Sequence, residues 1–512
     1  MSSAATSQKG EHLTSQPVDI DDAGRTGAPS RTSADLRQWL DAIDELGQVR
    51  RLEGVHWDVE IGTVSELNYR SPDPAALIFD KIIGYPAGFR VLTGSVSNAR
   101  RLGLTLSLGD DLDDEGLVAS LRGRPSAWQE GARNFPPHQV DTAPVFQNGG
   151  SGKDVDLLKF PVPRWHEADG GRYLGTGGVT VTVDHGTGVS NVGAYRAQVQ
   201  DDGATVTLNM VSGKHGAQHV QGWFRAESRA PVALVFGQDP LFLVLGGTEV
   251  PTGVSELAYA GAVLGRPVDV VSAPVTGLPV PASAEILLEG WLRPGDVRHE
   301  GPFGEWTGYY SGSDDPVLAV EVAGLYWRDD PIILGSPPGR PPHDYSYMRT
   351  VMKSAMIHDA LVATGLPGVK GVWAHEAGGG RLLLAVAISQ AYCGHSRQAG
   401  YLAAQCQPAA YMNRYVIVVD DDIDPCNLND VMWAVCTRSD PAEDIEVLRK
   451  TWGSKADPLL VDHRRPYNNR AVIDACVPYE RRSDFPPVAV ADPAALAAAR
   501  RRWGPVLGLP GA

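Results

Sequence analysis

The chain has 512 residues, of which 43% are hydrophobic and 21% are charged, and it carries a formal net charge of −16 with a pI near 5.3. This composition is that of an ordinary globular protein. Because a single hydrophobic core stops growing at roughly 250–300 residues, two or three domains are expected. Nucleic acids and anionic membranes attract basic protein surfaces, so the acidic balance argues against both as partners.

The sequence also argues against a membrane-spanning or secreted protein. The most apolar stretch, Pro231 to Gly247, is interrupted by Gln238 and Asp239 and falls short of the ~20 apolar residues that cross a bilayer. We interpret it as two buried strands. The N-terminus lacks the basic-then-apolar order of a signal peptide, and residues 1–31 are rich in Ser, Thr, Gly and Asp, which predicts a disordered segment. The five cysteines include no CxxC pair, so a reducing cytoplasm is expected.

Residues 32–144 are expected to form an N-terminal α/β domain. A helix is predicted after Thr32-Ser33, a possible N-cap, because four apolar residues follow at the spacing of one helical face. These residues are Leu36, Trp39, Leu40 and Ile43. Strands are predicted at residues 76–79 and 90–93. The acidic run at 110–115 could hold a metal ion, but acidic side chains also favour a helix N-terminus, and we interpret the run as a solvated helix start.

Residues 145–330 have a different sequence pattern from the first domain. They consist of short β-prone runs separated by glycine, such as Gly178-Val-Thr-Val-Thr-Val183 and Ala204-Thr-Val-Thr-Leu208. Turn signals at this frequency predict an antiparallel barrel or sandwich.

Residues 331–512 are expected to return to an α/β pattern. A helix is predicted at 347–361, a strand at 415–419, and a final Ala-rich helix at 493–503. Such a terminal helix packs either on a partner subunit or on its own domain, and the sequence does not choose between the two.

Two glutamates enclose a tight apolar turn, Glu300-Gly-Pro-Phe-Gly-Glu305, which keeps both carboxylates close together. Like charges this close cannot both ionise freely, so one pKa is expected to rise unless a cation intervenes. Arg196, at the end of Asn191-Val-Gly-Ala-Tyr-Arg196, is a candidate for that cation, and its planar fork also suits a substrate carboxylate. The alternatives are an exposed turn and an ordinary salt-bridged surface arginine.

Three further side chains offer an amide oxygen, an imidazole and a carboxylate: Asn191, His219 and Glu256. This mixture suits Mn²⁺ or Mg²⁺ better than zinc. His215 and His219 have a zinc-like spacing, but Gly216 stands where the Glu of H-E-x-x-H would be. Taken alone, either histidine is better explained as a core or surface residue than as a metal ligand.

Taken together and in order, four segments resemble the active site of the UbiD-family decarboxylases, which use prenylated flavin mononucleotide. They are Asn191 to Arg196, Gln218-His219, Gly253-Val-Ser-Glu256 and Glu300 to Glu305. The resemblance extends from about Leu36 to Asp440. It implies an N-terminal α/β domain, a split β-barrel that holds the cofactor, and a C-terminal α/β domain that oligomerises.

The resemblance also implies roles for individual residues. Arg196, Glu300 and Glu305 would form the catalytic ionic network, with Glu305 as proton donor. The Mn²⁺ (or Mg²⁺) that bridges protein and flavin phosphate would be held by Asn191, His219 and Glu256. The residues implied to line the prenylated flavin are Asn191, Val192, Gly193, Ala194, Tyr195, Arg196, Gln218, His219 and Glu256. A K⁺ ion is implied near Leu245 to Thr248 and Glu256. Where several relatives carry a lysine near the flavin phosphate, this chain has Gln407 and Pro408, and Arg414 is the nearest cation.

The implied function is reversible, non-oxidative decarboxylation of an aromatic, heteroaromatic or α,β-unsaturated acid. The implied enzyme is a cytoplasmic homodimer or homohexamer whose cofactor is supplied by a flavin prenyltransferase. Two alternatives stay open: a metal-dependent hydrolase that uses Glu300 and Glu305 as an acid/base pair, and a non-catalytic flavin-binding protein. The sequence does not identify the acid.

Overall fold

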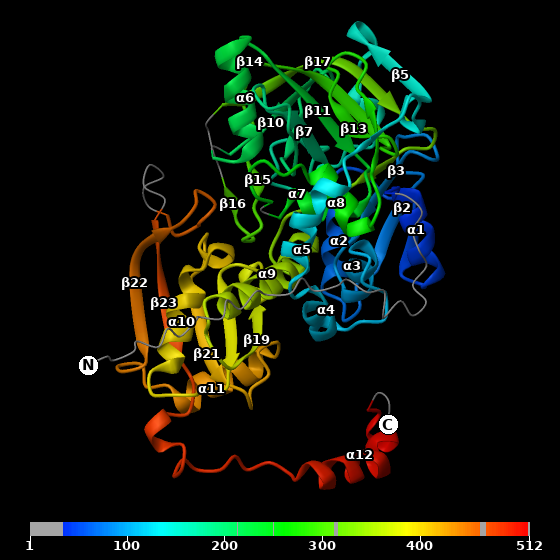
Figure 1. Cartoon of the computed structure of the whole chain (residues 1–512). Helices are drawn as coiled ribbons and strands as arrows, with labels where there is room; N and C mark the ends of the chain where they lie inside the picture. Colours follow the sequence, from blue (N-terminus) through cyan, green and yellow to red (C-terminus); the bar gives the residue numbers. More distant parts are fainter. Residues whose placement is uncertain (1–33, 212, 249, 312–315, 461–466, 510–512) are drawn as a thin grey trace, which may run out of the picture.

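A computed structural model of the chain describes residues 34–211, 213–248, 250–311, 316–460 and 467–509. The predicted disordered segment at 1–31 therefore lies outside the described residues. Figure 1 shows three bodies of mixed helix and sheet and a terminal helix set apart from them, which confirms the predicted α/β class. Among the helices that the structure describes, none is both long enough and apolar enough to cross a bilayer.

The first sheet has four strands in the order β1-β2-β3-β18, of which only the β2–β3 pair is antiparallel. Strand β18 (Ile332–Leu334) follows the predicted domain boundary at 330/331, yet it completes this N-terminal sheet. The preceding elements are α1 (Leu36–Glu45), β1 (Val49–Glu53), α2 (Glu60–Tyr69), β2 (Ala76–Asp80), β3 (Arg90–Thr93), α3 (Ala99–Thr105), α4 (Asp114–Leu121) and α5 (Arg124–Gly131).

Helix α1 is present as predicted, but its cap is not the predicted one. The side chain of Asp35 accepts hydrogen bonds from the backbone N–H groups of Arg37 and Gln38, at 2.7 and 3.3 Å. The four apolar residues predicted to share one face are all buried. The assignment of the cap to Thr32-Ser33 is wrong because a carboxylate, an equally good capping group, stands directly before the first turn.

The central body is a curled antiparallel sheet of nine strands, which supplies most of the candidate site. Its order is β6-β9-β10-β17-β14-β11-β7-β8, and β5 pairs with β17. The strands are β5 (Asn148–Ser151), β6 (Arg172–Tyr173), β7 (Val179–Val183), β8 (Ser190–Gly193), β9 (Ala197–Val199), β10 (Thr205–Leu208), β11 (Ala230–Phe236), β14 (Ile286–Arg298) and β17 (Val317–Trp327).

Helices cover the two faces of this sheet, because successive side chains of a strand point to opposite faces. Val181 and Val235 pack with α7 (Pro240–Gly246) and α8 (Glu256–Leu264), whereas Leu234 and Phe236 pack in the second core with Val220 of α6 (His215–Ala226). Two small sheets complete this body. They contain β4 (His138–Gln139), β12 (Asp269–Ser272) and β13 (Pro279–Pro281), and β15 (Phe303–Gly304) with β16 (Tyr310–Ser311).

The apolar stretch from Pro231 to Gly247 is one strand and one helix, and the prediction of two strands is wrong. Gly237, with φ of +75°, ends β11. Asp239 then accepts a hydrogen bond from the N–H of Leu241 at 2.9 Å, and Pro240 occupies the first helical position. These are the two usual marks of a helix N-terminus. A short apolar run has no periodicity that separates a buried helix from a buried strand.

The C-terminal body is a five-stranded sheet in the order β19-β20-β21-β23-β22, covered by helices on both faces. Val386 and Val418 pack toward α9 and α10, while the adjacent Ala387 and Val419 pack toward α11. Its elements are α9 (Asp344–Ala363), β19 (Val369–Ala374), β20 (Leu383–Ile388), α10 (His395–Gln405), β21 (Tyr415–Asp420), α11 (Leu428–Arg438), β22 (Ile445–Trp452) and β23 (Tyr467–Asp474). The predicted helix at 347–361 and strand at 415–419 are both confirmed.

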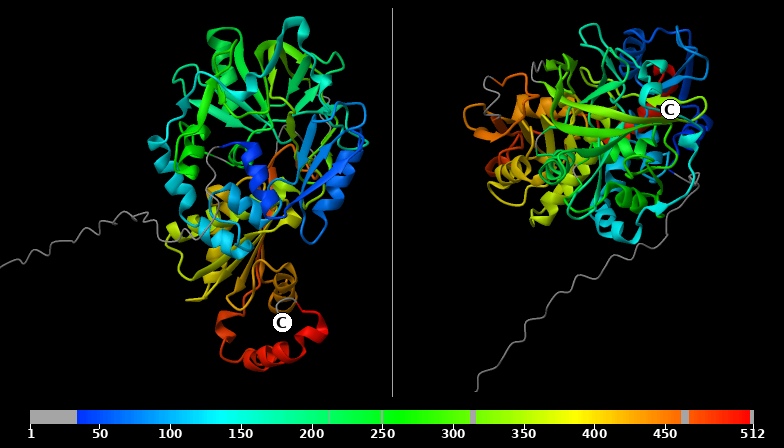
Figure 2. Two further views of the ribbon diagram at one scale, coloured as in Figure 1. Left: turned by 90° about the vertical axis from the view of Figure 1, so that its right-hand side faces the viewer. Right: turned by 90° about the horizontal axis from the view of Figure 1, so that it is seen from above.

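The predicted Ala-rich terminal helix is present as α12 (Pro493–Leu507). It stands away from the three bodies in Figure 1 and in the left view of Figure 2. Gly504 is the one residue of this helix that is buried.

Candidate active site

Arg196 lies between Glu300 and Glu305 and hydrogen-bonds to both. Its Nη2 donates to Glu300 Oε2 at 2.7 Å and its Nη1 to Glu305 Oε1 at 3.0 Å. The side chains of Arg196, Glu300 and Glu305 are 15%, 0% and 23% exposed. Burial lowers the pKa of Arg196, but the two carboxylates more than offset this and leave it above its ordinary value. The three predicted network residues are thus in direct contact, with a cation between the two like charges.

The turn that carries the two glutamates is fixed by close backbone packing. Gly170 lies against it so tightly that a Cβ on this glycine would stand 1.8 Å from the carbonyl oxygen of Gly301. The N–H of Gly170 donates to the carbonyl of Pro302 at 2.8 Å, and the N–H of Gly301 donates to Gln198 Oε1 at 3.1 Å. Gly301 itself has a φ of +94°, which favours glycine. The spacing of the carboxylates is therefore set by the backbone.

Two residues that the sequence analysis did not single out complete the surroundings of Glu300. The hydroxyl of Tyr173 donates to Glu300 Oε1 at 3.0 Å, and Asn209 Nδ2 donates to Glu300 Oε2 at 3.3 Å. The Tyr173 ring stacks on Phe303 with 3.8 Å between ring centroids. Neither residue belongs to a recognisable motif. The sheet brings Tyr173 next to the site by pairing β6 with β9, a contact that sequence spacing does not reveal.

Asn191 and Glu256 meet at the open edge of the central sheet, where β8 is the last strand. Asn191 Nδ2 donates to Glu256 Oε1 at 2.8 Å, and the backbone N–H of Val192 donates to Glu256 Oε2 at 2.7 Å. Burial raises the pKa of Glu256 to about 7. Asn191 Oδ1 is buried and has no hydrogen-bond partner among the described residues. A buried acceptor without a donor beside a buried carboxyl is what a cation-binding site presents.

His219 lies on α6, over the face of the sheet next to this edge. Its Nδ1 is 3.1 Å from the hydroxyl of Thr182, and Thr182 is the cross-strand partner of Asn191. Burial lowers the pKa of His219, which favours the neutral, metal-binding form of the ring. The contact at Nδ1 orients the ring and leaves Nε2 on its other side. Thr182, like Tyr173, is a supporting residue that the sequence analysis did not find.

Models of known protein families show which family contains this chain. They match the N-terminal domain of 3-octaprenyl-4-hydroxybenzoate carboxy-lyase over residues 40–121, its Rift-related domain over 138–341 and its C-terminal domain over 346–475, which is most of the chain. The chain belongs to the UbiD family. The predicted family, the three-part architecture with a curled half-barrel at its centre, and the carboxy-lyase class are confirmed.

Individual proteins are similar over most of the chain. The pyrrole-2-carboxylic acid decarboxylase of Pseudomonas aeruginosa is 32% identical over 439 residues, covering 81% of this chain and 85% of that protein. The UbiD-class enzyme HmfF of Pelotomaculum thermopropionicum, solved with FMN, is 26% identical with a TM-score of 0.79. The match covers 91% of this chain and 99% of the HmfF chain. The vanillic acid decarboxylase of Sedimentibacter hydroxybenzoicus in its open form is 26% identical with a TM-score of 0.77. The match covers 93% of this chain and 98% of the decarboxylase chain.

The other predicted flavin-lining residues of this UbiD-family chain fall into two groups. Residues between Asn191 and Arg196 pack tightly: Ala194 N–H donates to the carbonyl of Gly246 at 3.2 Å, and the Tyr195 hydroxyl accepts from the N–H of Gly216 at 3.2 Å. Gln218 points elsewhere. Its Nε2 donates to the carbonyl of Gly213 at 3.2 Å, and it lines a cavity of about 440 Å³ beside α6.

Arg414 forms an ion pair within the C-terminal body. Its Nη2 forms a 2.5 Å contact with Asp457 Oδ2, and the Asp457 side chain is 3% exposed. A buried ion pair of this kind holds both partners in place. The suggestion that Arg414 replaces the family lysine at the flavin phosphate stays a prediction.

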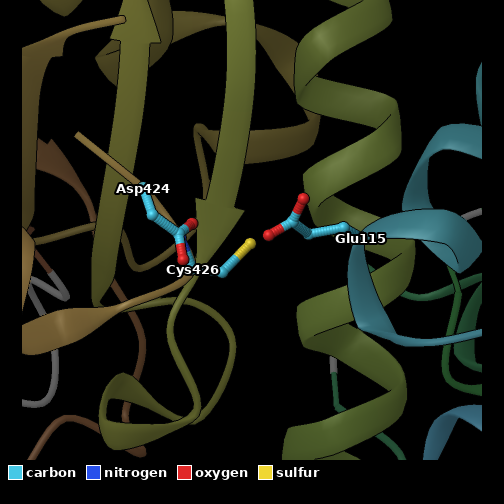
Figure 3. A group of neighbouring side chains, drawn as sticks. All are labelled: Glu115, Asp424 and Cys426. Carbon is cyan, nitrogen blue, oxygen red and sulfur yellow. The ribbon is translucent and has the colours of Figure 1, made fainter. Parts of the chain in front are cut away.

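A second group of ligand-type side chains lies where the N-terminal body meets the C-terminal body. Figure 3 shows Glu115, Asp424 and Cys426 pointing toward one another. Their potential ligand atoms all lie within 4.8 Å of one another. Burial, followed by the charge of Asp424, raises the pKa of Cys426 well above its ordinary value. Because the thiolate and not the thiol binds metal, we interpret this group as an interdomain contact.

The acidic run at 110–115 is a helix start, as predicted. Asp113 caps α4 by accepting from the N–H of Gly116 at 2.9 Å, and Asp114 and Glu115 lie in the first turn. The run is not merely solvated, because Asp114 Oδ1 also accepts from the hydroxyl of Tyr347 on α9 at 2.6 Å.

Proposed function

We propose that this chain catalyses the reversible, non-oxidative decarboxylation of an aromatic, heteroaromatic or α,β-unsaturated acid with prenylated FMN as cofactor. The observation that carries the proposal is the buried Arg196 held by both Glu300 and Glu305. Relatives solved with FMN and with the prenylated form support the cofactor. The name of the pyrrole-2-carboxylic acid decarboxylase makes heteroaromatic acids the first substrates to test.

The metal and cofactor assignment rests on the donor set at the sheet edge. Asn191 through Oδ1, His219 through Nε2 and Glu256 through its carboxylate would hold Mn²⁺ or Mg²⁺, and the ion would offset the flavin phosphate in an acidic chain. A monovalent K⁺ is proposed near Leu245 to Thr248, at the C-terminal end of α7, where the helix dipole favours a cation. When bound, prenylated FMN supplies the electron sink for the charge that decarboxylation leaves on carbon.

The residues of the network have separate tasks in this mechanism. Arg196 orients the substrate carboxylate. Its Nε is buried without a partner among the described residues, and an added carboxylate would provide the missing acceptor. As the bond between carbon and the carboxylate breaks and CO₂ leaves, Glu305 delivers a proton to the vacated carbon. Its 23% exposure gives it a route to recover that proton from water. Glu300 holds Arg196 in place through its hydrogen bond to Nη2.

The two alternative functions receive no support from the geometry. In a metal-dependent hydrolase, the two glutamates would need access to a metal-bound water, whereas both contact Arg196 here. A non-catalytic flavin-binding protein would not need the buried pairing of Arg196 and Glu300.

We also propose that the enzyme works in the cytoplasm and takes its cofactor from a flavin prenyltransferase. The five free cysteines fit the reducing conditions of that compartment.

The test is to co-express the chain with a flavin prenyltransferase and to assay the purified protein. We expect near-UV and visible absorption from the bound flavin, and CO₂ release from at least one acid in a panel led by pyrrole-2-carboxylate and including furan, indole, hydroxybenzoic and phenylacrylic acids. A fully loaded protein that releases no CO₂ from any of these acids would contradict the proposal.

Removing one metal ligand is expected to remove the flavin as well. His219→Ala and Glu256→Ala each leave the flavin phosphate, with a charge of about −2, less well neutralised. We expect colourless protein with little divalent metal, measured by absorption and elemental analysis. His185→Ala is the control, because this exposed histidine packs on Trp223 outside the site. Full flavin content without divalent metal in either ligand variant would overturn the metal assignment.

We further infer that α12 packs on a second copy of the chain in the proposed homodimer or homohexamer. An isolated helix of 15 residues is marginal in water, and four apolar side chains on α12 are exposed. They are Leu496, Trp503, Val506 and Leu507, at 61%, 49%, 78% and 68%. Burying each would contribute about 1.5–3 kcal/mol.

Replacing two of these side chains is expected to weaken the assembly. For Trp503→Glu/Val506→Glu, light scattering after size exclusion should give a lower mass than for the wild type at the same concentration. Leu67→Glu, at an exposed position on α2, is the control and should keep the wild-type mass. An unchanged mass in the α12 double variant would show that this helix does not hold the oligomer together.

A further inference from the structure

Trp306, the residue directly after Glu305, lies outside the apolar core of the central body. It is half-buried, and it is not among the described residues that form or border the apolar cores. It stands in the turn that joins β15 to β16, and Figure 1 shows this hairpin on the side of the central body that faces the C-terminal body. The ring therefore has its neighbours outside the core of its own body.

Two glycines of the C-terminal body lie directly against this ring and its surroundings. A Cβ on Gly379 would stand 2.5 Å from Cε3 of Trp306, and a Cβ on Gly380 would stand 2.8 Å from Cβ of Arg349 on α9. Both glycines have positive φ angles, of +63° and +68°. The turn at 379–380 thus fits between the Trp306 ring and α9 because neither residue has a side chain.

The first turns of α9 complete the surface on which the ring rests. The guanidinium carbon of Arg349 lies 5.4 Å from the centroid of the Trp306 ring and 4.9 Å from that of Tyr345. Both distances are within the roughly 6 Å range of a cation–π interaction. The hydroxyl of Ser346 donates to Glu376 Oε1 at 2.8 Å, which ties the start of α9 to the segment that leads into the glycine turn. The C-terminal body therefore presents a fixed seat for the ring.

The backbone of Glu305 belongs to the same turn as Trp306. The N–H of Glu305 donates to the carbonyl of Tyr309 at 2.9 Å, and its own carbonyl accepts from the N–H of Gly308 at 2.9 Å. A Cβ on Gly308 would stand 2.8 Å from Cα of Arg340, in the segment that leads into α9. A shift of the Trp306 ring would therefore move this turn, and with it the Glu305 carboxylate.

We propose that Trp306 is a positioning residue that anchors the turn after Glu300 to the C-terminal body and so fixes the place of Glu305 beside Arg196. This inference rests on the proposed function, and it concerns the place of the Glu305 carboxylate and not its protonation. All three residues of the network belong to the central body. The contact through Trp306 makes the C-terminal body part of what holds them in place.

Gly379→Ala tests the contact from the C-terminal side, far from the reacting atoms. In the flavin-loaded enzyme we expect kcat to fall about tenfold, because the new methyl group displaces the Trp306 ring, and misplacement by about 1 Å costs up to ~10²-fold. In a Trp306→Ala background the same change should alter kcat by less than about twofold. The strain of a positive φ is present in both backgrounds and cancels in the comparison. Equal fold-changes in the two backgrounds would overturn the inference.

Two variants control for strain and for loss of a tryptophan. Gly365→Ala introduces a side chain at a φ of +81° with no atom within 4 Å, and kcat should stay at the wild-type value. Trp291→Ala removes a ring that lies 3.9 Å from Arg229 within the central body, so it should lower the melting temperature and leave kcat unchanged. Trp306→Ala should lower kcat about 10- to 100-fold, and Trp306→Phe should recover most of the loss. Wild-type kcat in Trp306→Ala would contradict the positioning role.

Hydrogen exchange measured by mass spectrometry gives a readout that does not depend on turnover. The amides of Glu305, Gly379 and Gly380 are hydrogen-bonded within their turns, at 2.9, 2.7 and 3.1 Å. In Trp306→Ala, peptides from both turns should exchange about fivefold faster or more, because each turn loses its packing partner, whereas Trp291→Ala should change neither. Faster exchange confined to the peptide with Glu305 would show that the ring acts within its own body and would overturn the inference. If the wild type releases no CO₂ from any acid, the proposed function fails, while exchange at the two turns still decides whether Trp306 joins the two bodies.

Discussion

Glu305→Gln is expected to abolish turnover while leaving the fold and the flavin content nearly intact. The amide keeps the shape of the side chain and an oxygen for the 3.0 Å hydrogen bond from Arg196, but it has no acidic proton to deliver. Loss of a general acid usually lowers a rate by ~10²–10⁴-fold, and we expect a loss at least this large. Steady-state CO₂ release, with absorption and thermal melting of the same sample, measures all three quantities.

Glu321→Gln is the control for the effect of exchanging a carboxylate for an amide. Glu321 is an exposed residue of β17 that pairs with Arg293 at 2.6 Å, so its replacement should leave turnover unchanged. Substantial decarboxylation by a well-folded Glu305→Gln enzyme would remove Glu305 from the mechanism.

Arg196→Lys is expected to be nearly as damaging, although it conserves the charge. The guanidinium donates through two nitrogens to two different carboxylates, and a single ammonium group cannot reproduce both bonds in the same plane. Misplacement of a catalytic group by about 1 Å lowers rates by ~10²-fold, so we expect at least this loss in kcat/KM. The melting temperature should change little.

Arg293→Lys provides the comparison, because that arginine forms an exposed pair in which the same change should cost at most ~1 kcal/mol of stability. Wild-type kinetics in Arg196→Lys would mean that Arg196 is a structural ion-pair partner. The assignment of the whole network would then fail with it.

The sequence was sufficient for features that depend on local pattern. Helical spacing placed α1 and α9, and the Gly-Pro turn correctly indicated that Glu300 and Glu305 stay close together. Local pattern also misled in two places. The N-cap of α1 is Asp35 and not Thr32-Ser33, and the apolar run after Gly237 has the composition of a strand but folds as α7.

Features that depend on strand pairing could not be read from the sequence. Tyr173 reaches Glu300 across 127 positions, and Thr182 reaches His219 because α6 crosses β7. Strand β18 joins a sheet whose nearest member in sequence lies more than 200 residues earlier. In each case the contact follows from the curvature and order of the sheet, which no motif encodes. Supporting residues are therefore the part of a site that needs the structure.

The most direct test of the account is turnover of the flavin-loaded wild-type enzyme in D₂O, with the product examined by mass spectrometry and NMR. We predict one CO₂ released per acid consumed and one deuterium at the carbon that carried the carboxylate, delivered through Glu305. Consumption of an acid without CO₂, or a product that carries no deuterium at that carbon, would contradict the claim that this chain is a decarboxylase of the proposed mechanism.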